Sequence, residues 1–499
     1  MSSDTLLTLP TILSLVTATA LFFSPQRQTW VSTLSLLSAL IILLCSAMLL
    51  MQVIQNGPQA VAFGQWQAPF GVIFVADLFS AAMVMITAII GLASLCYACA
   101  DLCHKPSYKS YHALTHVLLA GVYGAFLTGD IFNLYVWFEV MLIASFGLMT
   151  LDAPRKQIDG AVKYVVLNLI ATLVFLLAIG LIYGATGTLN LADLHQKMPL
   201  VDSNIQQLLA ALLLFCFAIK AALFPVFAWL PASYPTLPYA VVGLFAALLT
   251  KVGVYALVRT FTLLFPLDLG HWQDLLLWIA GATMLVGVLG AVSQQSIKHI
   301  LAFHIISQIG YMIMGLAIFT PLALAGMIFY IVHHILVKAN LFFIGGVVAR
   351  YQGSSRLANL GGLYLAKPAL AFVFIFNAFS LAGLPPLSGF WGKYLVIKAS
   401  IDASFYWLAA VALLVGLLTI ISMTKIWNQA FWATNPNQSE PQSLPSLTRY
   451  YYGGAITLLT TMSLGMVIFV EPIYQFSLQA TQQLMTPTPY VNAIFGAGS

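Results

Sequence analysis

The chain has 499 residues, of which 61% are hydrophobic and 7% charged, and its formal net charge is +5. Soluble domains carry about 25% charged residues, so this composition excludes a soluble globular protein and any sizeable soluble domain. The charges are not clustered, and the positive balance therefore does not indicate nucleic-acid binding. We expect a protein that lies almost wholly within a lipid bilayer.

Apolar runs long enough to span a bilayer, roughly 20 residues each, recur along the chain. They predict an all-α, polytopic membrane protein with about fourteen transmembrane helices. The expected spans are 5–23, 29–53, 71–100, 111–129, 130–151, 160–185, 205–233, 238–262, 274–294, 298–319, 321–349, 369–398, 405–432 and 449–472. We expect the tail beyond Pro472 to be ordered only by partner subunits.

Basic residues at the helix ends favour one side of the membrane. Ten lie in odd-numbered loops, namely Arg27, Lys105, Lys109, Arg155, Lys156, Lys298, Arg350, Arg356, Lys367 and Arg449. Three lie in even-numbered loops, namely Lys197, Arg259 and Lys398. The positive-inside rule then predicts cytoplasmic odd loops and, for an even number of spans, both termini outside.

Five ionisable side chains lie inside apolar runs: Glu139, Lys220, Lys251, Lys338 and Lys393. A charge at the centre of a membrane helix costs roughly 2.5–3.5 kcal/mol. Such groups must therefore face the bundle interior, pair with each other or lose their charge. Intramembrane ionisable residues of this kind indicate a proton or ion path.

Two of the runs contain prolines close to a lysine. Lys220 precedes Pro225, and the pair Pro385-Pro386 precedes Lys393. Proline removes a helix hydrogen bond, and in membranes the freed carbonyls are tolerated where they line a polar cavity. We therefore predict that helices 7 and 12 are discontinuous, as in transporters built from repeats.

Several polar residues are further candidates for the path. His334 and Lys338 are spaced i, i+4 and share one helix face, and His304 and Gln308 have the same spacing as secondary candidates. His333 points about 100° away from His334, so we expect it to contribute to packing.

Other polar residues give little sign of a bound metal or cofactor. Asp77 stands near a helix start, where capping or packing is expected and a sodium-site carboxylate is the alternative; no other sodium site is evident. Cys96, Cys99 and Cys103 precede His104 in a pattern that can bind metal, but they end a membrane helix, and we predict packing and no metal. The sequence has no phosphate-binding loop, iron–sulfur pattern or hydrolase triad, so we expect no cofactor.

Several longer stretches carry a family resemblance. These are FLTGDIFNLYVWFEVMLIASF, KYVVLNLIATLVFLLAIGLIYGATGTLNLADL, ALFPVFAWLPASYPTLPYAVVGLFAALLTKVGVYALVR, IKHILAFHIISQIGYMIMG and LAGLPPLSGFWGK. They resemble the proton-translocating antiporter-like family, which includes the three large pumping subunits of respiratory complex I and the large subunits of Mrp-type sodium/proton antiporters. The resemblance spans roughly residues 70–430. The stretch around Glu139 and the separate stretch around His304 are similar to those of D-type Mrp subunits.

The resemblance implies a specific division of the chain. It implies two five-helix repeats of opposite orientation, helices 4–8 and 9–13, with broken helices 7 and 12 in equivalent places. The expected units are 1–110 with helices 1–3, 111–262 with the first repeat, 274–432 with the second repeat, and 449–499 with helix 14 and the tail.

The resemblance also implies roles for the buried residues. Glu139 matches a glutamate that pairs with the helix-7 lysine, here Lys220, and Lys251 matches the site that connects the two repeats. Lys393 matches the lysine of the second channel, and Tyr330 stands where some relatives have a second histidine. The implied path consists of Glu139, Lys220, Lys251, His334, Lys338 and Lys393, with His304 and Gln308 as secondary members.

The implied function is that of a membrane subunit, not an enzyme, of a bacterial inner-membrane antiporter that moves sodium out as protons enter. Its partners would be subunits of the A, B, C, E, F and G types. The alternative is a proton-pumping subunit of a complex I-like NADH dehydrogenase or a membrane-bound hydrogenase. A solute carrier acting alone is disfavoured because the buried lysines lie in series, and a purely structural scaffold would not need Glu139 and Lys220.

Overall fold

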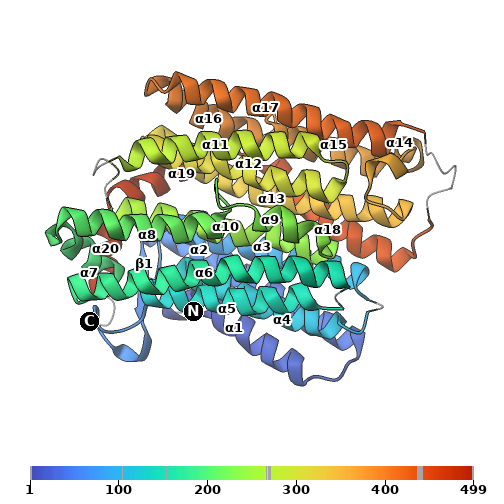
Figure 1. The fold of residues 1–499 in the computed structure, drawn as a ribbon. Coiled ribbons are helices and arrows are strands. Elements are labelled where there is room, and N and C mark those ends of the chain that lie inside the picture. The colour runs from blue at the N-terminus through green and yellow to red at the C-terminus, as the bar shows by residue number, and fades with distance from the viewer. Residues whose placement is uncertain are drawn as a thin grey trace.

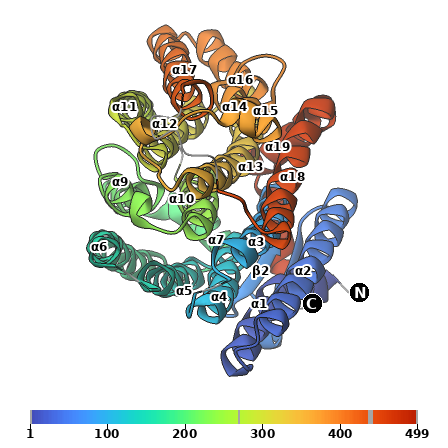
Figure 2. The ribbon, with the colours of Figure 1, turned by 90° about the vertical axis from the view of Figure 1, so that its right-hand side faces the viewer.

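The fold is a bundle of long, roughly parallel helices (Figure 1). The computed structural model describes residues 3–103, 105–152, 154–265, 267, 271–434 and 442–496. In the end-on view of Figure 2, α10 (Tyr239–Leu263) and α13 (Pro321–Gln352) lie near the centre. Both helices are apolar on all sides, and nearly all of their side chains are buried. They therefore form the core of the bundle.

The described residues of the first half of the chain form ten helices. They are α1 Ser3–Phe23, α2 Gln28–Asn56, α3 Leu78–Asp101, α4 Tyr108–Leu127, α5 Ile131–Thr150, α6 Arg155–Thr186, α7 Leu191–Lys197, α8 Ser203–Ala221, α9 Trp229–Ser233 and α10. The second half continues with α11 Trp272–Ser293, α12 Ile297–Ile318, α13, α14 Leu363–Ala366, α15 Pro368–Ala382, α16 Ser388–Asp402, α17 Tyr406–Trp427, α18 Ser446–Ile468, α19 Val470–Met485 and α20 Thr488–Gly496. Short 3-10 or π turns are η1 Phe63–Gln65, η2 Met198–Leu200, η3 Tyr234–Thr236, η4 Leu357–Asn359 and η5 Asn428–Trp432.

The predicted all-α, multi-spanning fold is confirmed. Helices occupy all of the predicted spans, and 12 of those described are long and apolar enough to cross a membrane. The seventh and twelfth spans are broken as predicted, into α8 and α9 and into α15 and α16. The inverted repeats and the unit boundaries stay predictions.

A small hairpin precedes α3 where helix was expected. Strand β1, Gln59–Ala62, pairs antiparallel with β2, Ile73–Ala76, and α3 begins only at Leu78. The residues of β2 are all buried and apolar, so composition does not separate them from the helix that follows.

The expectation for the C-terminal tail was wrong. The tail forms α19 and α20, and α19 packs against α13 and α3 within this chain. Its buried residues Ser477, Ala480, Thr481 and Leu484 lie on one helix face. Because α19 is amphipathic, a search for continuous apolar runs does not detect it.

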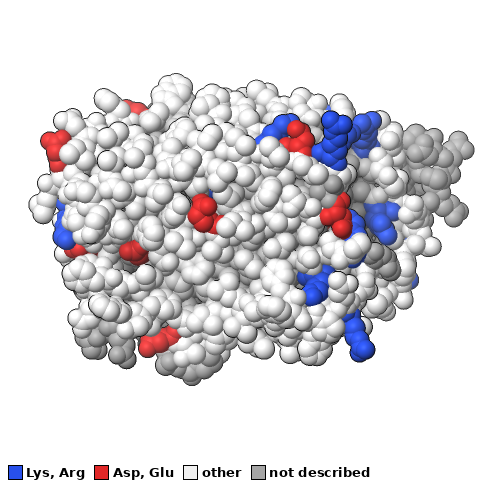
Figure 3. All heavy atoms as spheres, turned by 60° about the horizontal axis from the view of Figure 1, so that its bottom comes forward, with Lys and Arg blue, Asp and Glu red and all other residues white. Residues whose placement is uncertain are grey.

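The surface has the division expected of a membrane protein. Large apolar side chains are exposed along the outer helices. In Figure 3 most of the visible Lys and Arg gather toward one end of the molecule, and most of the flank carries no charge. This charge-poor flank is the surface suited to lipid.

Candidate functional site

Lys220 lies just before the first helix break. The side chain is buried, with Nζ 3.5 Å from the Asn168 carbonyl oxygen on α6 and 5.3 Å from the centroid of the Phe138 ring on α5. The break follows at Ala222, which adopts a left-handed conformation with φ of 60°. A cavity of about 20 Å³ beside Lys220, lined also by Asn168 and Tyr164, has the size needed for one water molecule.

Glu139 is not in contact with Lys220. Among the described residues, the ion pairs within 4.0 Å do not include these two, and Glu139 Oε1 is buried without a hydrogen-bond partner. The ring of Phe138 faces Lys220, and the next side chain, Glu139, is rotated about 100° around α5 and is half-buried. The expected direct pair is therefore corrected to two nearby but separate charges.

The central residues are completely buried. Lys251 on α10 donates to the Ala246 carbonyl at 2.5 Å and to Thr250 Oγ1 at 3.2 Å. On α13, Lys338 Nζ and both ring nitrogens of His334 have no hydrogen-bond partner in the described part of the chain. Buried polar atoms without partners are costly, and in a membrane interior they indicate functional rather than packing roles.

Lys393 is held by the second helix break. Its Nζ donates to the carbonyls of Leu381, at 3.0 Å, and Ala382, at 3.1 Å, which are the last two residues of α15. The Tyr311 ring centroid lies 4.6 Å from the same nitrogen. The break thus supplies carbonyl oxygens to an ammonium group, and a cavity of about 340 Å³ adjoins it.

Tyr330 lies among the buried candidate residues in the second half of the chain. Its hydroxyl donates to Gln308 Oε1, and its ring centroid lies 6.0 Å from Lys393 Nζ and 6.2 Å from the His334 ring. His304 is bonded instead to Ser422 on α17, at 2.6 Å. Gln308 therefore belongs to the cluster around Lys393, whereas His304 faces another helix.

Asp77 is a structural residue. Its carboxylate caps α3 by accepting from the Ser80 amide at 2.8 Å, and it forms a buried ion pair with Arg259 at 2.7 Å. The Tyr490 ring of α20 lies 4.8 Å from the Arg259 guanidinium. The capping role is confirmed, and the sodium-site alternative is disfavoured because the carboxylate is already neutralised. Arg259, counted above as a loop residue, lies inside α10.

Two buried histidine clusters were not identified from the sequence. Ser35 of α2 bonds both His112 and His116 of α4, at 2.9 and 3.0 Å, and the i, i+4 spacing of this pair was a usable signal. His333, expected to contribute only to packing, bonds Ser388 at 2.9 Å. No spacing in the sequence indicates that contact.

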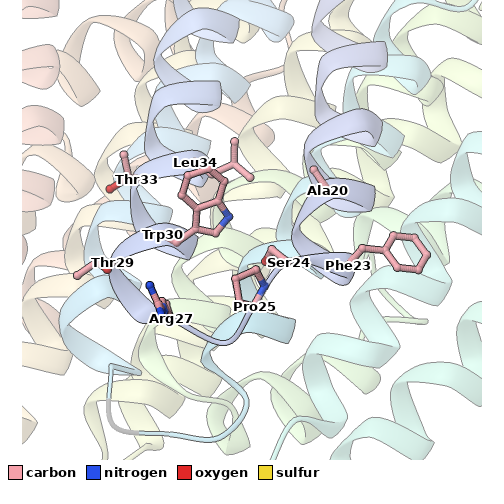
Figure 4. A pocket seen from close by; sticks show the side chains of 9 residues that line it. All are labelled: Ala20, Phe23, Ser24, Pro25, Arg27, Thr29, Trp30, Thr33 and Leu34. Atoms are coloured by element: carbon pink, nitrogen blue, oxygen red, sulfur yellow. The ribbon is translucent and has the colours of Figure 1, made fainter.

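The cysteines and a cavity between α1 and α2 add no second site. Cys99 Sγ accepts from the Tyr108 hydroxyl at 3.3 Å, and no group of three potential metal ligands occurs within the described residues; His104 lies outside them. A cavity of about 700 Å³ opens between the ends of α1 and α2, where Trp30 and Arg27 lie on its wall (Figure 4). None of the buried lysines lines it.

Comparisons with known proteins identify the family. A family model described as NADH:quinone oxidoreductase/Mrp antiporter, TM, matches residues 128–419. The D subunit of the Na⁺/H⁺ antiporter from Alkalihalophilus pseudofirmus is 44% identical over 98% of this chain and 99% of that protein. The D subunit of the Na⁺/H⁺ antiporter from Bacillus subtilis is 35% identical over 97% and 98%.

Solved structures agree with these matches. A chain of the Mrp complex from Dietzia sp. superposes with a TM-score of 0.92 at 33% identity, covering 99% of this chain and 100% of that chain. A chain of respiratory complex I from Thermus thermophilus shares the fold, with a TM-score of 0.82 at 24% identity over 96% and 99%. The chain therefore belongs to the family of membrane subunits that NADH:quinone oxidoreductases and Mrp antiporters share.

Proposed function

We propose that the chain is a D-type membrane subunit of a multisubunit cation/proton antiporter and not an enzyme. Inward proton movement through it would drive sodium efflux across a bacterial cytoplasmic membrane. The observation that carries the proposal is the series of buried ionisable residues from Lys220, beside the first helix break, to Lys393, beside the second, in a chain 44% identical to the D subunit of an antiporter. Membranes tolerate such residues where they conduct protons or ions.

The proton would pass along this series of buried residues, here called the axis, and the charges nearby would control each step. Lys220 has one distant carbonyl partner, so its ammonium form depends strongly on the position of the Glu139 carboxylate. Approach of that carboxylate stabilises the bound proton, and its withdrawal releases the proton toward Lys251. The remaining steps would use His334, Lys338 and Lys393, named here in chain order.

The partners would be subunits of the A, B, C, E, F and G types. Glu139 is half-buried on α5, at a flank where apolar residues such as Phe132 and Ile143 are exposed. A carboxylate facing lipid is costly, so a neighbouring subunit would cover this flank. We propose that the two five-helix repeats, 111–262 and 274–432, each carry one half of the axis.

A redox-driven proton pump is the second candidate. It would use the same buried residues but take its energy from electron transfer in another subunit. The likeness to complex I concerns the fold alone, at 24% identity, whereas the antiporter relatives reach 44%. The antiporter assignment is therefore preferred.

The test compares substitutions in the fully assembled complex. Glu139→Ala and Lys220→Ala should each abolish sodium-dependent collapse of a proton gradient in everted vesicles. Glu139→Asp should retain part of the activity, and the double variant should be no worse than either single one, because both disable one step. Assembly is measured separately. Near-normal exchange by Glu139→Ala in assembled complexes would contradict the proposed axis.

A further inference from the structure

A cluster of four buried polar side chains lies beside the second helix break. His333 Nδ1 on α13 bonds the hydroxyl of Ser388, the first residue of α16, at 2.9 Å. Ser388 also bonds Ser380 of α15 at 3.0 Å and Ser463 of α18 at 3.3 Å. Each of these four side chains is at most 1% exposed. Four separate helices thus direct polar groups at one another inside an apolar bundle.

The packing around this cluster keeps α16 close to the histidine. A Cβ on Gly389 would lie 1.9 Å from the Ser380 carbonyl oxygen and 2.7 Å from His333 Nε2. That nitrogen, the second one of the ring, is buried and has no partner among the described residues. Serine hydroxyls elsewhere, such as that of Ser46, bond the carbonyl of their own helix instead. Packing alone does not require the shared arrangement around Ser388.

The cluster adjoins the proposed path. The His333 ring centroid lies 5.4 Å from that of Tyr330, whose ring is 6.0 Å from Lys393 Nζ. The titratable groups around His333 are thus Tyr330, the adjacent His334 and Lys393, whereas α15 and α18 contribute hydroxyls. Beyond Ser463, α18 ends at Ile468 and α19 folds back over α13.

We propose that His333, Ser388 and Ser463 form a branch that carries protons between Lys393 and the end of the bundle where α18 terminates. This inference rests on the proposed function. The proton leaves the Lys393 ammonium and binds His333 Nε2 through bound water. The Nδ1 proton then passes to Ser388 Oγ as the Ser388 hydroxyl gives its own proton to Ser463 and the Ser463 hydroxyl gives its own to water. Inward proton flow runs the same steps in reverse. Only N–H and O–H bonds form and break, so no other reactant is needed.

Substitutions at Ser388 test the branch with little change in volume. Ser388→Ala removes the bridging hydroxyl, and Ser388→Thr keeps it. We expect Ser388→Ala and His333→Gln to lower sodium-driven proton exchange per assembled complex about tenfold or more, as loss of a proton-transfer group does. Ser388→Thr should retain most of the rate. The rate that remains in Ser388→Ala should show a larger H2O/D2O ratio than that of the unaltered complex.

Matched controls separate proton transfer from packing. Ser400→Ala removes an equally buried hydroxyl from α16 that donates only to the Phe405 carbonyl. His112→Gln alters an equally buried histidine that also bonds a serine, far from the break in sequence. Both controls should exchange normally. If Ser388→Ala fails to assemble, Ser463→Ala at the far end of the branch gives the same test.

The outcomes distinguish this branch from the proposed axis. Normal exchange by Ser388→Ala and His333→Gln, or equal losses in Ser400→Ala and His112→Gln, would overturn the branch. If Glu139→Ala is inactive while the branch variants are normal, only the branch is wrong. If the branch variants are inactive while Glu139→Ala is normal, the branch stands and the axis through Glu139 is wrong.

Discussion

The buried lysines differ in the atoms that hold them, and this decides how each can respond to substitution. Lys393 has two carbonyl partners, Lys251 has a carbonyl and a hydroxyl, and Lys220 has one carbonyl at 3.5 Å. Lys220 is therefore the least constrained of these three, which suits a residue whose charge partner changes. Lys393 is the most firmly positioned.

Lys393→Arg tests whether the charge at this position must be released. The adjoining cavity of about 340 Å³ leaves room for the larger guanidinium. Arginine keeps the positive charge but does not deprotonate in proteins. We expect assembled complexes with no sodium-dependent proton exchange in everted vesicles. Exchange near the normal rate would show that Lys393 supplies a fixed charge and not a mobile proton.

Asp77→Ala tests whether the Asp77 carboxylate has a structural role or binds sodium. It leaves the buried Arg259 charge unpaired, which typically costs roughly 3–5 kcal/mol. We expect a lower melting temperature and a lower yield of assembled complex, with an unchanged sodium KM in the complexes that form. Asp402→Ala, which removes the partner of Lys398 in an exposed ion pair, is the control and should change little. A raised sodium KM with normal stability would restore Asp77 as a sodium ligand.

At the scale of elements, most helices could be predicted from the sequence and several contacts could not. Bilayer-length apolar runs and prolines beside lysines predicted the spans and both breaks. The contact between His333 and Ser388 joins residues 55 positions apart, so no local spacing indicates it. Two elements were missed because of their local composition. The amphipathic α19 lacks a continuous apolar run, and the buried strand β2 continues the apolar run of α3.

Gly253→Ala tests the packing of α10 against the first break. A Cβ at Gly253 would lie 2.6 Å from the Ala221 nitrogen and 2.8 Å from the Lys220 carbonyl carbon. These are backbone atoms that cannot rotate away, so α8 and α10 must separate and Lys220 must shift. We expect a large loss of exchange rate and a lower melting temperature. Gly180→Ala on α6, which has open space around the new methyl group, should not lower stability.

At the scale of the whole molecule, the basic end predicts the orientation in the membrane. Figure 3 shows most of the visible basic side chains toward one end, and the positive-inside rule assigns that end to the cytoplasm. In a background without the five native cysteines, Lys156→Cys should react with an impermeant thiol reagent only after permeabilisation. Ser499→Cys should react from outside in cells stripped of outer barriers. The reverse pattern would invert the topology.

This chain should exchange ions poorly without its partner subunits. In the single chain Glu139 is half-buried beside exposed apolar side chains of α5, such as Phe132 and Val136. Lipid at this flank would disfavour the carboxylate form, and Glu139 could then no longer stabilise the charge on Lys220. Liposomes with the purified chain should therefore show little sodium-dependent proton movement, and liposomes with the whole complex should show it fully. Glu139→Gln is the control: it should abolish exchange by the complex and leave the weak single-chain signal unchanged. Robust exchange by the single chain would mean that the proton path is complete without a neighbouring subunit.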